Sequence, residues 1–568
     1  MVILLNASRY SVGEVNAFAF VWQNWHWSIS TRTANVRGKT HSTMEQRSVE
    51  TQTTRPHQDH TATRYRWVQR IIHYFFTEDI SPDNHTIVEL QRKGIWIGLA
   101  LILQSLNEID HNWYFPYMGP FGSLIPFALL IGSFIAMAMA FRSGSKKQQA
   151  MQNHPRRWQK VVLILTLLVT IAGGIEFGRS VVMSFLPPQF SNDGTSLDTN
   201  AAMLLLEGRN PYTDSNMLDL ARRFPIQPNW TTPLMLGQFA NAKDYPSMVD
   251  FQTVLDTDLK AGTAPEFESK VSYPALSFLT LVPFALVKDY NVLPFYLLSY
   301  LVLVGIAWKV ARPEMRKWIV LLAMANVPMW ASTVGGNLDI FYALLIVMVW
   351  LLRDRRWSSA LFLGLALASK QIAWFFIPFY MIMVFRHYGL KEVVYRLLIA
   401  GTIGLAFNLP FILWNPQAWL AGILAPMADP MFPMGVGIVD LSVTHLIPFF
   451  PKWAYSVLEA VAMLASLAWY WRICKRVPEA AMLLAVLPLF MAWRSLSSYF
   501  YCAAFPLFVL MTAKAHPNMA VQTQAVRKDK AASIAKKFIG AFPPVPEAVG
   551  IRAFAYPSHM FRYFSPPR

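Results

Sequence analysis

The chain has 568 residues, of which 54% are hydrophobic and only 15% charged, and its mean hydropathy is +0.32. This balance excludes an ordinary soluble domain and indicates a membrane protein. The formal net charge of +17 would suit a nucleic-acid binder. The basic residues, however, gather in short loops between apolar runs, so we expect no nucleic-acid partner.

The N-terminal region, residues 1–94, reads as a basic, Ser/Thr/His-rich arm that we expect to be disordered. It shows no apolar stretch followed by a small-residue cleavage site, so no cleavable signal peptide is predicted. Tyr65–Ile72 suits a short interfacial helix. A translation start at Met44 would also explain the composition of this arm.

Apolar runs then recur over residues 95–513 and predict an all-α polytopic membrane protein with about 10–13 transmembrane helices. A β-barrel would instead show alternating segments of about ten residues. Ile95–Leu106 is a marginal run that would also suit a surface helix. The clearer runs are Phe121–Phe141, Val161–Val182, Val292–Trp308, Trp318–Ala331, Ile340–Leu352, Trp357–Ala368, Ile372–Phe385, Leu397–Trp414, Ala454–Trp471, Ala480–Trp493 and Tyr499–Thr512.

The basic loops predict the orientation of these helices, because Lys and Arg concentrate on the cytoplasmic side of membrane proteins. We therefore expect both termini in the cytoplasm, including a basic, disordered tail over 514–568, and a multi-pass protein of the plasma membrane. The loops in question carry Arg142, Lys146, Lys147, Arg156, Arg157 and Lys160, then Lys309, Arg312, Arg316 and Lys317, then Arg353, Arg355 and Arg356, then Arg386, Lys391 and Arg396, and finally Arg472, Lys475 and Arg476.

This orientation places the long polar loop 183–272 outside the cell. The following stretch, Ala275–Val287, resembles a span but is punctuated by Pro274 and Pro283. If it crossed the membrane, every later basic loop would face outward. We therefore predict a re-entrant or interfacial segment that helps to line a cavity.

The outer loop holds two candidate catalytic acids. Asp193 follows Pro187-Pro188, which end the preceding span, and it would lie near the membrane surface as a general base toward an acceptor hydroxyl. Asp198 in the same segment is the competing candidate. Either acid would equally suit the first turn of a helix, and a loop acid is often only solvated.

Lys370 and Arg494 interrupt apolar sequence at the predicted outer ends of helices, where cations are disfavoured. Phosphate is a natural partner for both, although each would also suit a side chain that extends from a helix end to water. Arg222 and Arg223 are further candidates for an anionic headgroup, or else belong to a solvated helix face. Asp339 would cap the helix that follows Gly335-Gly336-Asn337, or line the same site.

Cofactor motifs are not recognisable. The two cysteines, Cys474 and Cys502, give neither a disulfide framework nor a metal cluster. No glycine-rich nucleotide loop, HExxH or CxxC pattern stands in a meaningful context. We therefore predict no metal ligands.

These features together resemble the GT-C superfamily of integral-membrane glycosyltransferases, and most of all its bacterial GT87-type, mannosyltransferase-like group. The resemblance covers about residues 160–512. The motifs that carry it are Asn192-Asp193-Gly194, Ala201–Tyr212 with its Asn210-Pro211-Tyr212 turn, Tyr273-Pro274-Ala275-Leu276, Gly335–Asp339, Lys370-Gln371 with Pro378, and Trp493-Arg494-Ser495 with Tyr499.

The resemblance implies a GT-C-like bundle with a large first extracytoplasmic loop of short surface helices. It implies an inverting transfer of a sugar, with a mannose-type hexose favoured, from a polyprenyl-phosphate donor to a lipid, glycan or protein acceptor. Asp193 then looks like the base, with Asp198 still in competition. Lys370 and Arg494 look like donor-phosphate ligands, and Gln371, Tyr212 and Asp339 look like further substrate contacts. Some relatives use a divalent cation.

Two departures from the family pattern concern the acceptor. Tyr273-Pro274-Ala275-Leu276 stands where relatives often have two prolines, and the usual aromatic residue shortly after the acid is missing. The acceptor contacts are therefore expected to differ.

Two rival functions come from other classes of protein: a transporter or flippase of a lipid-linked sugar or other amphiphile, and a catalytically silent membrane scaffold.

Overall fold

The computed structural model describes residues 69–76, 85–113, 121–141, 155–187, 190, 192–224, 231–242 and 244–513. The chain divides into two compact units, Met1–Ala513 and Lys514–Arg568. The second unit and residues 1–68 lie outside the described residues, and so do the disordered tail and most of the N-terminal arm that the sequence predicts.

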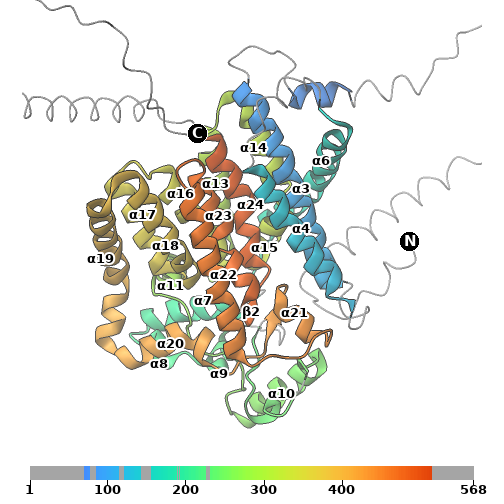
Figure 1. Cartoon of the computed structure of the whole chain (residues 1–568). Helices are drawn as coiled ribbons and strands as arrows, with labels where there is room; N and C mark the ends of the chain where they lie inside the picture. The colour runs from blue at the N-terminus through green and yellow to red at the C-terminus, as the bar shows by residue number, and fades with distance from the viewer. Residues whose placement is uncertain are drawn as a thin grey trace, which may run out of the picture. The chain divides into compact units, whose positions relative to one another are not determined.

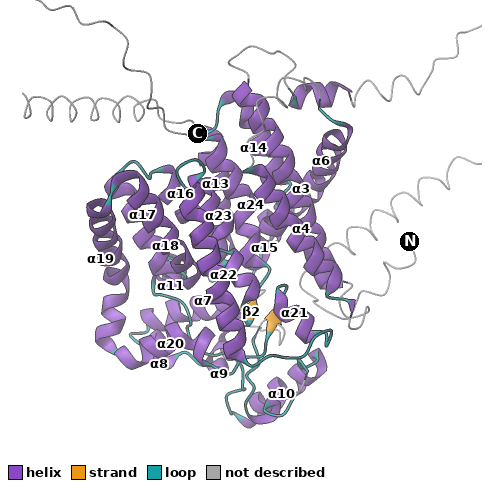
Figure 2. Ribbon diagram, viewed as in Figure 1, coloured by secondary structure: helices purple, strands orange, loops and turns teal. Residues whose placement is uncertain are grey.

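Helices make up nearly all regular structure in the described residues, as Figure 2 shows. Two short strands, β1 (Met434–Gly435) and β2 (Arg494–Ser495), pair in parallel. The predicted all-α polytopic membrane fold is confirmed. Outside the loop 183–272, the longer helices are α3 (His85–Trp113), α4 (Leu124–Ala140), α6 (Arg157–Met183), α13 (Leu293–Val310), α16 (Leu338–Leu351), α17 (Arg356–Ser369), α18 (Phe376–Tyr388), α19 (Leu390–Trp414), α20 (Pro416–Ala428), α22 (Lys452–Ile473) and α24 (Ser498–Thr512).

Within the described residues, three helices are long and apolar enough to cross a membrane by themselves, namely α6, α13 and α19. A fourth span results if α14 (Arg316–Met324), with its preceding turn, and α15 (Val327–Gly335) are taken together, although they are bent by 54°. Pro328 in the first turn of α15 accounts for this break. Four further apolar segments, 124–140, 338–351, 478–491 and 498–512, are shorter, so the predicted 10–13 spans exceed the number that meets this test.

The marginal run Ile95–Leu106 belongs to a long helix. It lies inside α3, which has 29 residues. Ile95, Ile97, Ala100 and Leu101 are fully buried in the main core. The surface-helix alternative is therefore wrong, because tertiary packing on both sides of this helix outweighs its moderate hydropathy. The first ten residues of this helix, 85–94, belong to the predicted arm.

The segment 275–287 forms two very short helices, α11 (Leu276–Leu279) and α12 (Val282–Leu286). Pro283 lies in the first turn of α12. At 1.5 Å per residue neither helix approaches the roughly 30 Å of a bilayer core. The structure therefore has no continuous helical span here, as predicted. The backbone N–H of Ala275 donates to Asn408 Oδ1 of α19 at 3.0 Å, which holds the segment against the bundle.

The loop 183–272 is folded. It contains α7 (Asp193–Leu206), α8 (Pro211–Asp214), α9 (Met217–Arg223) and α10 (Met248–Ala261), and Figure 1 shows α10 at the lower end of the bundle. Short helices were predicted here. Their packing depends on a cluster of edge-to-face aromatic rings from distant parts of the chain: Phe239, Tyr245, Phe251, Phe267 and Phe432.

Candidate active site

A polar cavity of about 340 Å³ lies where α7, the turn before α16, the end of α17 and β2 meet. Elements far apart in the sequence line it together. Its charged and polar lining includes Glu108, Asn192, Asp193, Thr232, Tyr245, Tyr273, Asn337, Asp339, Lys370 and Arg494. The cavity thus brings together Asp193, Lys370 and Arg494, as predicted for a joint site, and adds Asp339.

The N-terminus of α7 positions Asp193. The Asn192 side chain caps this helix by accepting from Thr195 N at 2.8 Å. Its amide also donates to Gly336 O at 2.6 Å, so the cap joins α7 to the turn before α16. Asp193 is half-buried, and its Oδ1 accepts only a local bond from Gly194 N (2.9 Å) among the described residues. Asp193 lines the cavity, and this carboxylate oxygen has spare capacity to accept a hydroxyl proton.

Thr232 connects Asp193 to Arg494. Both its backbone N–H (3.1 Å) and its hydroxyl (2.6 Å) donate to Asp193 Oδ2. The same hydroxyl oxygen accepts from Arg494 Nη2 at 3.2 Å. Since a hydroxyl has one proton, the bond from Arg494 commits that proton to the carboxylate. The Thr232 hydroxyl therefore connects the Asp193 carboxylate to the Arg494 guanidinium by two hydrogen bonds.

Arg494 is fixed through its backbone. It pairs with Met434 in the two-residue sheet, and Gly435 pairs with Ser495. Gly435 has φ +136°, and a Cβ there would lie 2.2 Å from Ser495 O, so only glycine fits this approach. The guanidinium contacts Met431 Sδ at 3.1 Å and forms no ion pair with a carboxylate among the described residues. Its charge therefore remains available to an anionic ligand.

Lys370 differs from Arg494 because the protein already supplies its counter-ion. Lys370 forms an ion pair with Asp339, and the two side chains are only 6% and 2% exposed. Its ammonium also lies 5.1 Å from the Tyr273 ring and 5.9 Å from the Tyr499 ring. Lys370 ends α17 in an extended conformation, which turns it away from the helix toward the cavity. A buried pair of this kind stays together because either charge alone would be costly.

Asp339 does not cap α16, which was one of its two predicted roles. Asn337 is the cap, and its side chain accepts from Asp339 N at 2.9 Å. The preceding Gly336 has φ +76°, and its carbonyl accepts from Asn192 and Thr195 of α7. The turn thereby leaves the Asp339 carboxylate free to pair with Lys370.

Asp198, the competing acid, does not line the cavity. It is 1% exposed and accepts a 2.9 Å hydrogen bond from the Ser277 hydroxyl of α11. Burial raises the pKa of Asp198 to about 8, although the Ser277 bond and the Lys370 charge act in the opposite direction. This acid holds α7 against α11. Of the two candidates, only Asp193 reaches the cavity.

Two further candidates serve as structural contacts. The Gln371 amide donates to Ser272 O and to Ile423 O (3.1 Å), which joins the end of α17 to α20. The Tyr212 hydroxyl donates to Tyr273 O at 2.8 Å from within an aromatic cluster with Phe278 and Phe411. Neither Gln371 nor Tyr212 lines the cavity. Both instead fix the backbone that carries Tyr273, which does line it.

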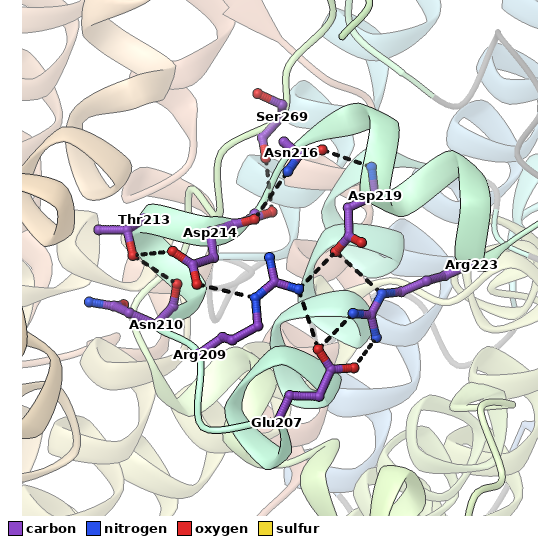
Figure 3. A network of polar contacts seen from close by, with 10 residues as sticks. Glu207, Arg209, Asn210, Thr213, Asp214, Asn216, Asp219, Arg223 and Ser269 are labelled. Atoms are coloured by element: carbon purple, nitrogen blue, oxygen red, sulfur yellow. Dashed lines mark hydrogen bonds and ion pairs between the residues drawn. The ribbon is translucent and has the colours of Figure 1, made fainter. Parts of the chain in front are cut away.

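The remaining arginine candidates lie outside the cavity. Figure 3 shows Arg223 bound to Glu207 at 2.5 and 2.8 Å and to Asp219 at 3.3 Å. Arg209 completes this network with Asp214 and the same two acids. Arg222, on the same helix α9, is exposed. The network closes on itself and joins α7, α8 and α9.

Several lining residues had no clear signal in the sequence. Thr232 and Tyr245 lie in irregular stretches of the outer loop, and Glu108 lies in α3, far away in the sequence. The Tyr501 hydroxyl donates to Glu108. Burial raises the pKa of Tyr245 to about 12, with Arg494 and Asp193 exerting opposite effects. Tyr273 belongs to a recognised motif, but its place beside Lys370 follows only from the fold.

A divalent cation has no evident site in the described residues. No group of three or more His, Cys, Asp or Glu side chains there is arranged to hold a metal ion. The cavity carboxylates are already engaged: Asp193 by Thr232, Asp339 by Lys370 and Glu108 by Tyr501. These side chains do not fit a metal centre, and no step below depends on one.

The helical membrane fold and the comparison with family models together define a class: the chain is a membrane glycosyltransferase. Residues 272–493 match the model of Glycosyltransferase family 87, which confirms the predicted resemblance to that group. Comparisons with curated proteins and with solved structures gave no match. The matched region contains Asp339 and Lys370 and ends one residue before Arg494. It favours the enzyme over the transporter and scaffold alternatives.

Proposed function

We propose that this glycosyltransferase transfers a hexose, of the mannose type, from a polyprenyl-phosphate donor to a lipid, glycan or protein acceptor. In this proposal the reaction takes place at the extracytoplasmic face of the cell membrane, with both termini in the cytoplasm, and inverts the anomeric centre. One observation carries the proposal: Asp193, Arg494 and the Lys370–Asp339 pair line a single cavity.

The charges of the cavity suit the two requirements of the reaction. An inverting transfer needs a base beside the acceptor hydroxyl and positive charge beside the departing phosphate. Asp193 lines the cavity, and Thr232 holds its Oδ2 while Oδ1 accepts only the local bond from Gly194 N among the described residues. Arg494 lies on the other side of Thr232 at 3.2 Å, so base and cation are neighbours without forming an ion pair.

The bond changes follow from this arrangement. The acceptor oxygen attacks the anomeric carbon while its proton passes to Asp193. The bond between that carbon and the phosphate oxygen breaks, and its electron pair stays on the lipid phosphate. Arg494 stabilises the charge on the phosphate through its guanidinium donors, which match phosphate geometry.

Lys370 contributes in a different manner. Its pairing with Asp339 and its position between Tyr273 and Tyr499 hold it in the cavity wall. A pair with little net charge can orient a ligand but attracts an anion less than an uncompensated cation does. We therefore assign the main phosphate contact to Arg494 and a supporting one to Lys370.

The test is sugar transfer by purified protein supplied with a polyprenyl-phosphate-linked mannose. Asp193→Asn should lower the rate by about 100-fold or more, the range for loss of a general base. Asp256→Asn is the matched control, because Asp256 is an exposed acid on α10 of the same loop. Full activity of the Asp193 variant would assign the base to another residue, and transfer from a nucleotide sugar alone would exclude the lipid donor.

Membrane sidedness has its own test. Thr257 is exposed on α10, whereas Cys474 and Cys502 are buried, so Thr257→Cys adds one accessible thiol. A membrane-impermeant thiol reagent should label this variant in intact cells. Labelling only after the cells are opened would place the loop in the cytoplasm and contradict the proposal.

A further inference from the structure

A second cavity, of about 610 Å³, lies between the helical residues near Tyr74, α6, the end of α13 and the start of α14. Its lining combines aromatic and charged side chains: Tyr74, Phe75, Trp308, Glu314, Arg316 and Lys317. None of these residues belongs to the candidate active site. The reaction proposed above makes no use of them.

The two cavities lie at opposite ends of α13. Leu293 and Tyr296, at its first turn, pack beside Gly336 of the active-site turn. Trp308, near its last residue, lines the second cavity. A helix of 18 residues is about 27 Å long, close to the roughly 30 Å of a bilayer core. Figure 1 likewise shows α14 and β2 well separated along the bundle. With α13 as a membrane span, which its length and composition allow, the second cavity falls at the headgroup level of the leaflet opposite the active site.

The cations of this cavity are held by aromatic rings. The Arg316 guanidinium stacks 4.2 Å from the centre of the Trp308 ring, and Lys317 Nζ lies 4.7 Å from that of Tyr74. Lys317 also donates to Tyr74 O. Arg316 Nε is buried without a hydrogen-bond partner in the described part of the chain. A buried donor of this kind calls for a ligand that the protein itself does not supply.

Two apolar side chains of the cavity lining are also exposed at the protein surface. Trp308 is 46% exposed and Val320 48% exposed, although both sit in helices of the bundle. Such side chains suit contact with lipid acyl chains. Glu314 also lines the cavity, but it forms no ion pair with either cation in the described residues. The cavity thus combines positively charged side chains with apolar side chains beside them.

We propose that this cavity binds the anionic headgroup of a glycerophospholipid in the leaflet opposite the active site. Arg316 supplies planar donors to the phosphate and Lys317 a compact charge, while the acyl chains follow Trp308 and Val320. A zwitterionic choline headgroup fits poorly, because the faces of Trp308 and Tyr74 are already occupied by the protein's own cations.

The test uses the purified full-length chain in neutral detergent, titrated with phosphatidylglycerol or phosphatidylcholine, with bound lipid counted by native mass spectrometry. Wild-type protein should prefer phosphatidylglycerol by about 5-fold or more, since each basic side chain near an anionic lipid contributes on the order of 1 kcal/mol. Arg316→Gln combined with Lys317→Gln should abolish that preference. Lys317→Gln alone, which keeps the stacked arginine, should reduce it and serves if the double variant fails to fold.

The matched control is Lys309→Gln combined with Arg312→Gln, which removes two charges from the same basic loop outside the cavity lining. It should keep the wild-type preference. Equal loss in the control would overturn the site, because diffuse charge would then explain the binding. Equal affinity of the wild type for both lipids, or full competition by inorganic phosphate, would also overturn it. Lipid binding is measured without sugar transfer. Failure of this inference can therefore be distinguished from failure of the proposed function.

Discussion

Two charged networks in this protein use the same kinds of residues to different ends. In the network of Figure 3, Arg209 and Arg223 are surrounded by Glu207, Asp214 and Asp219 at the partly exposed surface of the outer loop. In the cavity, Asp339 compensates Lys370, whereas Arg494 has no carboxylate partner among the described residues. A cation that can bind an anionic ligand is therefore distinguished by the lack of a carboxylate partner in the protein, rather than by its position in a loop.

Burial should produce the largest difference between the networks. Asp339→Asn leaves the Lys370 ammonium uncompensated inside the protein and should lower the free energy of unfolding by about 3–5 kcal/mol. Asp219→Asn, in the partly exposed network of Figure 3, should cost about 1 kcal/mol or less. Thermal unfolding of both variants in the same detergent compares them. Equal shifts in melting temperature would mean that the cavity pair is more solvated than its exposure indicates.

Arg494, which has no carboxylate partner among the described residues, gives the next comparison with the network of Figure 3. Arg494→Gln should reduce kcat/KM for a polyprenyl-phosphate sugar by about 100-fold, as loss of a donor to developing charge does elsewhere. Arg223→Gln should change it by less than about 3-fold, because its partners are structural surface acids. Steady-state kinetics with varied donor measures both. Comparable losses would show that the surface network acts in catalysis and would remove the distinction drawn here.

The link between base and cation should have a smaller effect. Thr232→Val removes the hydroxyl that donates to Asp193 and accepts from Arg494, and should lower kcat by about 10-fold, since a hydrogen bond to a charged group is worth roughly 1.5–3 kcal/mol. The KM for the donor should stay nearly constant, because the role assigned to Thr232 is to position Asp193 and Arg494. Thr232→Ser keeps the hydroxyl and should restore most of the rate. Equal defects in the two variants would indicate a packing role only.

The smallest expected effect is a dependence of stability on pH. Burial raises the pKa of Glu268 to about 8 from 4.5, and that of Asp198 to about 8 from 3.8. The folded state then holds protons that the unfolded state has released. This contribution is complete below about pH 4 and is lost as the pH rises through 8.

Glu268→Gln should therefore flatten the fall in melting temperature between pH 5 and pH 8, by an amount on the order of a few degrees. Asp256→Asn, at an exposed position, should leave the slope as in the wild type. A slope that does not change in the Glu268 variant would argue that this carboxyl is ionised in the folded protein.

The sequence predicted the membrane class, the positions of most helices and the gathering of Asp193, Lys370 and Arg494. Hydropathy identifies the membrane helices. The rarity of cations at their outer ends singles out Lys370 and Arg494, however far apart these residues lie in the sequence. It did not predict that Asp339 would pair with Lys370, nor that Thr232 would join Asp193 to Arg494. The first contact depends on how α16 and α17 pack, and the second on how the outer loop folds; no local sequence pattern encodes either.

The sequence also could not choose between Asp193 and Asp198, because both suit the first turns of one helix. The choice follows from the rotation of α7: Asp198 turns toward Ser277 and Asp193 toward the cavity. Similarly, the run Trp318–Ala331 is one continuous apolar segment in the sequence. It is bent by 54° in the structure, because Pro328 begins a new helix.

The tight approach at Gly435 makes this position intolerant of change. Any side chain there would push apart the two short strands and displace the arginine that the second strand carries. In a survey of random substitutions, variants at this glycine should appear among the inactive ones although the residue supplies no functional group. Activity would then require this bare backbone as strictly as it requires the charged side chains.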